Sequence, residues 1–159
     1  MPVHIGQIGV AFARATFLHS RVAPGARARP VILVVDSNDD VREMYCAFFT
    51  YKGYECIAAA TGDEAMKLLL ERVPDLVLLE ESIRGIDGWR VLKTIRANPL
   101  LRSIQVVMLT ADVFEMPRER AEHLGADGFA AKPVLVDDLA RLVRRLLKSA
   151  AGTDQGLTH

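Results

Sequence analysis

The chain has 159 residues, half of them apolar and a quarter charged, with a formal net charge of zero. This length suits one domain with a substantial core. The neutral balance gives no reason to expect a nucleic-acid partner. No apolar run is long enough to cross a membrane, so we expect a cytoplasmic protein without a membrane partner.

Residues 1–29 differ in composition from the rest of the chain. They contain four arginines and no acid, so they carry +4 and the remaining residues carry −4. Apolar residues at loose helical spacing, followed by a Pro- and Gly-containing stretch at 24–30, indicate an extension and a linker. Arg14 interrupts the apolar stretch, which argues against a secretory signal. We interpret the segment as a weakly structured extension; an amphipathic arm that docks on this domain or on a partner is the alternative.

From Val31 onward, apolar runs suited to strands alternate with helical patterns. The expected strands are 31–35, 54–58, 76–79, 104–109 and 128–131. The expected helices are 39–52, one that opens at the capping box Thr61–Glu64, 88–97, 113–124 with Pro117 near its first turn, and 135–148. Continuous apolar strands are typical of a parallel sheet that is covered on both faces.

This alternation of strands and helices predicts an α/β fold with a doubly wound, five-stranded parallel sheet. The flavodoxin-like strand order 2-1-3-4-5 is the natural choice for five βα units. We expect the domain to span 30–149 and a short polar tail to occupy 150–159, with no output domain attached. Cys46 and Cys56 have no zinc or CxxC spacing, and we interpret them as two half-buried free thiols.

Polar residues directly follow four of the expected strands: Asp36, Glu80, Thr110 and Lys132. In doubly wound sheets, functional groups gather beyond the carboxyl ends of the central strands. Taken singly, Asp36 and Thr110 can be read as helix or turn caps and Lys132 as a surface lysine. The coincidence of all four is more specific and predicts one site.

Residues 30–149 resemble a response-regulator receiver domain, the module of two-component signalling. The resemblance is carried by Val34-Val35-Asp36, Leu109-Thr110-Ala111, Gly125-Ala126-Asp127-Gly128, Lys132-Pro133 and the run from Pro74 to Gly88. It implies a cis peptide bond before Pro133, a switch hydroxyl at Thr110 and an aromatic switch at Phe129. It also implies transfer of phosphate from a histidine kinase to an aspartate, with Mg²⁺ held by acids of the first and third strands.

The chain departs from that pattern at two positions. Glu80 stands where the family has the acceptor aspartate, and Ser37 stands where it has a second acid after the first strand. The extra methylene of Glu80 moves its carboxylate by about 1.5 Å, which disturbs in-line attack. We therefore assign no catalytic residue and expect no enzymatic activity.

The same two changes weaken the expected metal site. Asp36, Glu80 and Lys132 sum to −1, whereas the family's three acids and lysine sum to −2. Mg²⁺ requires a tight octahedron of oxygen ligands. We expect weak or absent Mg²⁺ binding, with Asp36, Glu80 and Ser82 as the ligand positions. Asp39 and Asp40 are better explained as first-turn acids of a helix.

Three hypotheses for function remain open. The first is a stand-alone receiver-like module that has lost efficient phosphoacceptance, in which Glu80 reaches toward Lys132 and Thr110. It would bind a histidine kinase or other signalling proteins through the face of the last two helices and the fifth strand, which is also the candidate homodimer interface. The second is a working phosphoacceptor with unusual chemistry. The third, a small-ligand binder, is weakest because no Gly-rich phosphate loop follows the first strand.

Overall fold

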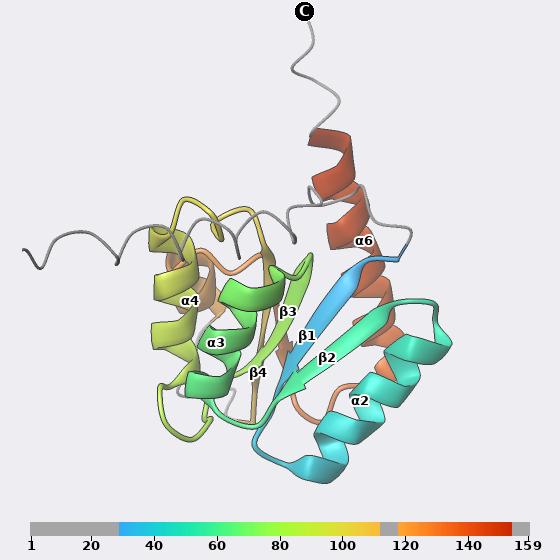
Figure 1. Ribbon diagram of the computed structural model, residues 1–159. Helices are drawn as coiled ribbons and strands as arrows, with labels where there is room; N and C mark the ends of the chain where they lie inside the picture. The colour runs from blue at the N-terminus through green and yellow to red at the C-terminus, as the bar shows by residue number, and fades with distance from the viewer. Residues whose placement is uncertain (1–28, 112–117, 154–159) are drawn as a thin grey trace, which may run out of the picture.

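The computed structural model describes residues 29–111 and 118–153 (Figure 1). The proposed arm within residues 1–28 lies outside these ranges. So do Pro117, the first part of the helix expected at 113–124, and the end of the expected tail.

One parallel sheet of five strands organises the chain, in the order β2-β1-β3-β4-β5. The flavodoxin-like prediction is therefore confirmed. The strands are β1 (Val31–Val35), β2 (Glu55–Ala59), β3 (Leu76–Glu80), β4 (Gln105–Thr110) and β5 (Gly128–Ala131). β2 and β4 each lie one residue further along the chain than the apolar pattern predicted.

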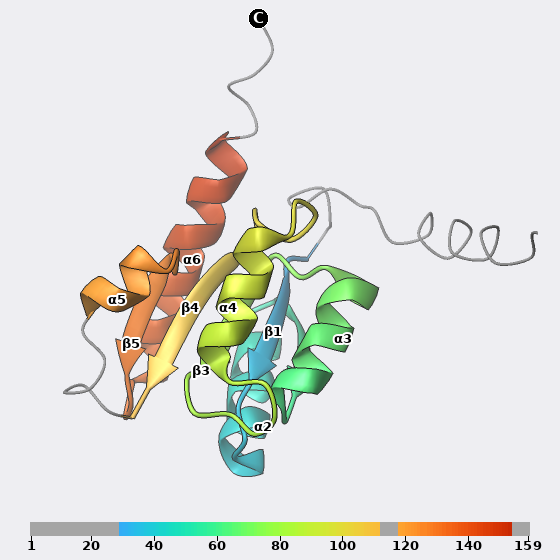
Figure 2. The same cartoon turned by 90° about the vertical axis from the view of Figure 1, so that its left-hand side faces the viewer.

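Helices cover both faces of the sheet. They are α2 (Asp39–Tyr51), α3 (Gly62–Arg72), α4 (Gly88–Ala97), α5 (Arg118–His123) and α6 (Val136–Thr153). In Figure 2, α3, α4 and α5 lie on the near face of the sheet, and α2 and α6 lie behind it. Among the described helices, none has the length and apolar character needed to span a membrane.

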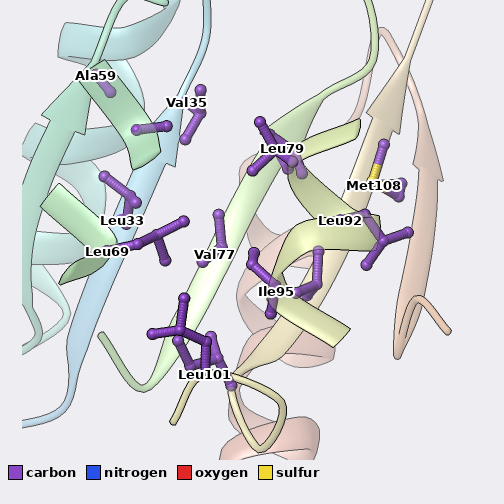
Figure 3. Close-up of a cluster of buried hydrophobic side chains, with 14 of the residues drawn as sticks. Leu33, Val35, Ala59, Leu69, Val77, Leu79, Leu92, Ile95, Leu101 and Met108 are labelled. Carbon is purple, nitrogen blue, oxygen red and sulfur yellow. The ribbon is translucent and has the colours of Figure 1, made fainter. Parts of the chain in front are cut away.

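Each strand sends alternate side chains into two separate cores, as the period of two requires. Leu33, Val77 and Met108 face α3 and α4, where they pack with Leu69, Leu92 and Ile95 (Figure 3). Their neighbours in the strands, including Ile32 and Leu78, pack instead with residues of α2 and α6. The continuous apolar runs of the sequence reflect burial on both faces.

The structure corrects two expectations. Cys46 and Cys56 are joined in a disulfide, so they are not the free thiols expected from their spacing. Cys46 lies on α2 and Cys56 on β2, and the turn between these elements brings them together. The last helix also continues to Thr153, so four residues of the expected tail are helical. The apolar stripe that defined the helix in the sequence ends earlier than the helix itself.

Candidate functional site

The carboxyl ends of β1, β3, β4 and β5 meet at one edge of the sheet. Val35 is aligned with Leu79, Glu80 with Leu109, and Thr110 with Ala131. Asp36 follows β1 directly, Glu80 and Thr110 end their strands, and Lys132 follows β5. This register places the four predicted residues side by side.

Lys132 joins the two acids of this edge. Its Nζ donates to Asp36 Oδ2 at 2.5 Å and to Glu80 Oε1 at 3.3 Å. The Asp36 side chain is fully buried, and the side chains of Lys132 and Glu80 are each 18% exposed. The predicted contact between Glu80 and Lys132 is thus present. We call Asp36, Ser37, Glu80 and Lys132 the strand-end cluster.

Ser37 binds the second oxygen of the Glu80 carboxylate. Its backbone N–H donates to Glu80 Oε2 at 2.9 Å, and its Oγ donates to the same oxygen at 2.8 Å. The Ser37 hydroxyl also lies 3.4 Å from the carbonyl oxygen of Ser82. Ser37 therefore supplies two hydrogen-bond donors to one oxygen of the Glu80 carboxylate.

The charge distribution favours ionised partners. Burial alone would raise the pKa of Glu80, but the hydrogen bonds from Ser37 and the charge of Lys132 outweigh it, and the pKa is lowered. Burial would likewise lower the pKa of Lys132, but the hydrogen bond and charge of Asp36, supported by Glu80, raise it. Glu80 and Lys132 are thus held as a carboxylate and an ammonium.

Glu81 is a functional candidate that the sequence pattern did not identify. The Thr110 hydroxyl, buried at the end of β4, donates to Glu81 Oε2. The sequence analysis predicted that Thr110 would contact Glu80. The only sign of a role for Glu81 in the sequence is that it is an acid directly after the third strand. The backbone of Glu81 also donates to Leu109 O at 2.9 Å, which fixes this loop against β4.

The remaining predicted residues lie on β5, directly after it, and at the start of α4. The Lys132–Pro133 peptide bond is cis, as predicted. Phe129 is half-buried on β5 and packs against the core on the α3–α4 side. Asp87 caps α4 by accepting from Arg90 N at 2.9 Å, which agrees with its interpretation as turn chemistry. A Cβ at Gly88 would lie 2.3 Å from the Glu80 carbonyl oxygen, so glycine permits the close approach of α4 to this edge.

The carboxylate oxygens of the strand-end cluster already have partners within the chain, which weakens any magnesium site there. The described residues contain no group of three or more His, Cys, Asp or Glu side chains that could hold a metal. Both oxygens of Glu80 face donors of the chain itself, and so do those of Asp36, which accept from Lys132 and from Asn38 N. Mg²⁺ needs free carboxylate oxygens in a tight octahedron. Asp39 pairs with Arg42 at 2.6 Å, and both Asp39 and Asp40 lie in the first turn of α2.

A five-stranded doubly wound sheet with a buried aspartate, a partly exposed glutamate, a lysine and a cis Lys-Pro bond at its carboxyl edge is typical of a signalling domain of the receiver type. The family model described as the response regulator receiver domain matches residues 32–144, so this chain belongs to that family. Receiver domains are generally non-enzymatic modules of two-component signalling.

Known relatives support the assignment. The chain is 33% identical over 117 residues to the phosphate regulon transcriptional regulatory protein PhoB of Klebsiella pneumoniae, an alignment that covers 74% of this chain and 51% of PhoB. It thus spans about half the length of this curated relative. The signal receiver domain of a signal transduction histidine kinase from Syntrophus aciditrophicus is 30% identical, with a TM-score of 0.69 over 76% of this chain and 91% of that one. A CheY-like receiver domain protein from Methanospirillum hungatei, 22% identical, shares the fold with a TM-score of 0.73 over 79% of this chain and 99% of that one.

Proposed function

We propose that this receiver domain does not accept phosphate efficiently and acts by binding other signalling proteins in the cytoplasm. The observation that carries the proposal is that both oxygens of the Glu80 carboxylate already accept hydrogen bonds within the chain. One oxygen of its carboxylate accepts from Ser37 and the other faces Lys132. Both oxygens of the Glu80 carboxylate thus already have partners within the chain, which disfavours attack on an incoming phosphoryl group.

The chemistry of phosphoryl transfer explains why this matters. Transfer requires an acceptor oxygen in line with the leaving group, and neutralisation of the charge on the transferred group. The longer Glu80 side chain misplaces the acceptor oxygen. The Ser37 substitution removes an acid that the family pattern places near the metal. Mg²⁺ binding is therefore weak or absent.

The same geometry supports imitation of a phosphorylated state. Glu80 holds a negative charge 3.3 Å from Lys132 Nζ. Lys132 is the cation that we expect to bind a phosphoryl oxygen in a phosphorylated domain. This contact biases the domain toward an active-like arrangement. The partners are a histidine kinase or other signalling proteins that dock on the face of α5, β5 and α6, through which a homodimer can also form.

Phosphate labelling tests the proposal. The chain is incubated with acetyl phosphate and Mg²⁺, and intact-protein mass spectrometry counts the adducts. We expect no stoichiometric adduct on the wild-type chain. The double variant Ser37→Asp/Glu80→Asp restores the acid pair and is expected to gain Mg²⁺-dependent labelling. Ser37→Asp/Glu80→Gln is the matched control, because it restores the acid without an acceptor.

The second candidate is a working acceptor at Glu80. Its lowered pKa and its partial exposure favour it, because an ionised and accessible carboxylate is a nucleophile. A stoichiometric adduct on the wild-type chain that disappears in Glu80→Gln would establish this function and overturn the first proposal.

A further inference from the structure

A second chemical site lies away from the strand-end cluster, where α2 covers the edge of the sheet. Cys46 of α2 and Cys56 of β2 form a disulfide with a Cα–Cα distance of 5.4 Å, and they are ten positions apart in the sequence. Both residues are half-buried. This Cα–Cα distance falls within the usual range for disulfides, so α2 and β2 are already placed for the bond.

The disulfide lies at the border of the sheet. β2 is an edge strand that pairs with β1, and Cys56 is aligned there with Ile32. The bond closes a loop that contains the end of α2 and the turn at Gly53. Oxidation therefore fastens the second half of α2 to an edge strand that has one neighbour in the sheet.

The first half of α2 is fastened to the strand-end cluster. Asn38 N donates to Asp36 Oδ1 at 2.9 Å, and Arg42 donates to Asp36 O at 2.7 Å. Tyr45, the neighbour of Cys46 on the helix, is buried in the core between α2 and the sheet. The same helix thus connects the cysteine pair with the functional edge of the domain.

We propose that Cys46 and Cys56 form a reversible thiol–disulfide site that reacts with low-molecular-weight disulfides of the glutathione class. A thiolate of the reduced pair attacks one sulfur of the small disulfide, forms a mixed disulfide and releases one small thiol. The second cysteine then attacks the mixed disulfide, forms the Cys46–Cys56 bond and releases the second small thiol. The cysteine pair loses two electrons, the small disulfide gains them, and both thiol protons leave with the two small thiols.

The test uses the whole chain and glutathione. Alkylation with N-ethylmaleimide followed by intact-protein mass spectrometry counts free thiols after treatment with oxidised glutathione, and again after return to reduced glutathione. We expect no label in the first state and two labels in the second. Because closing a short loop restricts the unfolded chain, oxidation is expected to raise the melting temperature by about 10 °C.

Matched variants separate the disulfide from other effects of glutathione. Cys46→Ser/Cys56→Ser should show no change of melting temperature between the two buffers, and Cys46→Ser alone should stop at one glutathione adduct. Two labels on the wild-type chain in oxidised glutathione, or a stable glutathione adduct on it, would overturn the proposal. A bond that resists reduced glutathione until the chain unfolds would overturn its reversibility.

Discussion

The Glu80 side chain is longer than that of an aspartate by one methylene, and this extra length determines which groups its carboxylate contacts. It reaches Lys132 on one side and Ser37 on the other. An acid in place of Ser37 would face Glu80 as a like charge, whereas the serine hydroxyl donates a hydrogen bond to it. Ser37 and Glu80 are therefore compatible neighbours in the strand-end cluster.

Glu80→Gln should change how stability depends on pH. The pKa of Glu80 is lowered in the fold from its ordinary value of 4.5, so its contribution is present above that value and is lost as pH falls through the folded pKa. Glutamine keeps the length and does not titrate. We expect the free energy of unfolding to fall more steeply for the wild-type chain than for Glu80→Gln as the pH decreases below about 5.

Urea unfolding at a series of pH values measures this difference. If the free energies of unfolding of the two proteins change in parallel down to about pH 2, ionisation of Glu80 does not stabilise the fold.

Lys132→Met should destabilise the domain by about 3–5 kcal/mol, because it leaves the fully buried Asp36 carboxylate without its cation. The pKa of Lys132 is raised, so its contribution is complete below the ordinary value of 10.5 and is lost as pH rises through the folded pKa. Urea unfolding at neutral pH therefore measures the whole effect.

Two variants control for the loss of a lysine. Lys67→Met removes an ammonium whose side chain is 74% exposed, and it should change stability by less than about 0.5 kcal/mol. Asp36→Asn/Lys132→Met should recover much of the loss, since it removes the unpaired charge. Equal losses from Lys132→Met and Lys67→Met would contradict the buried-pair account.

The sequence predicted Asp36, Glu80 and Lys132 as neighbours because each follows an apolar strand and parallel strands end at one edge. It did not predict that Ser37 donates to Glu80, since this bond depends on where the longer side chain turns. It also missed Glu81 as the acceptor for Thr110. Two successive acids after a strand do not reveal which one points toward the neighbouring strand.

At the scale of elements, local signals fixed the helix starts better than the helix ends. Thr61 caps α3 by accepting from Glu64 N at 3.2 Å, and Glu64 accepts in return from Ala60 N at 2.8 Å. The Thr61 contact agrees with the capping box in the sequence, whereas Glu64 binds the N–H of the residue before the cap. The end of α6 has no comparable signal, and the helix runs to Thr153. The disulfide was missed for a related reason: it depends on how α2 and β2 pack, whereas the sequence shows only the spacing of two cysteines.

Thr61→Ala should destabilise the domain by about 1 kcal/mol, because the Thr61 hydroxyl accepts from the backbone N–H of Glu64 in the first turn of α3. Thr94→Ala is the matched control. Thr94 lies within α4, where its hydroxyl donates to Arg90 O on an exposed face, and its loss should cost less than about 0.5 kcal/mol. Chemical denaturation of both variants measures the difference, and an equal effect would exclude a special role of the cap.

At the scale of the whole molecule, hydrogen bonds join the ends of three strands. Glu81 N donates to Leu109 O at 2.9 Å, and Lys132 N donates to Thr110 O at 2.7 Å. The Thr110 hydroxyl donates to Glu81, and Lys132 Nζ donates to Glu80 Oε1 at 3.3 Å. A change at the end of β3 is thereby connected to β5, which carries Phe129 and forms part of the proposed docking face.

Glu81→Ala should remove the Thr110 hydrogen bond from this set and leave the contacts of Glu80 and Lys132 in place. We expect amide chemical shifts to change at Thr110 and along residues 129–132, with a loss of stability of about 1 kcal/mol for one hydrogen bond. Glu43→Ala, on the exposed surface of α2, is the control and should leave those shifts unchanged. Two-dimensional nitrogen–proton spectra of the three proteins make the comparison. If Glu81→Ala perturbs only its immediate sequence neighbours, Thr110 is held by the packing of β4 and not by Glu81, and a signal at the end of β3 has no route through this residue to the docking face.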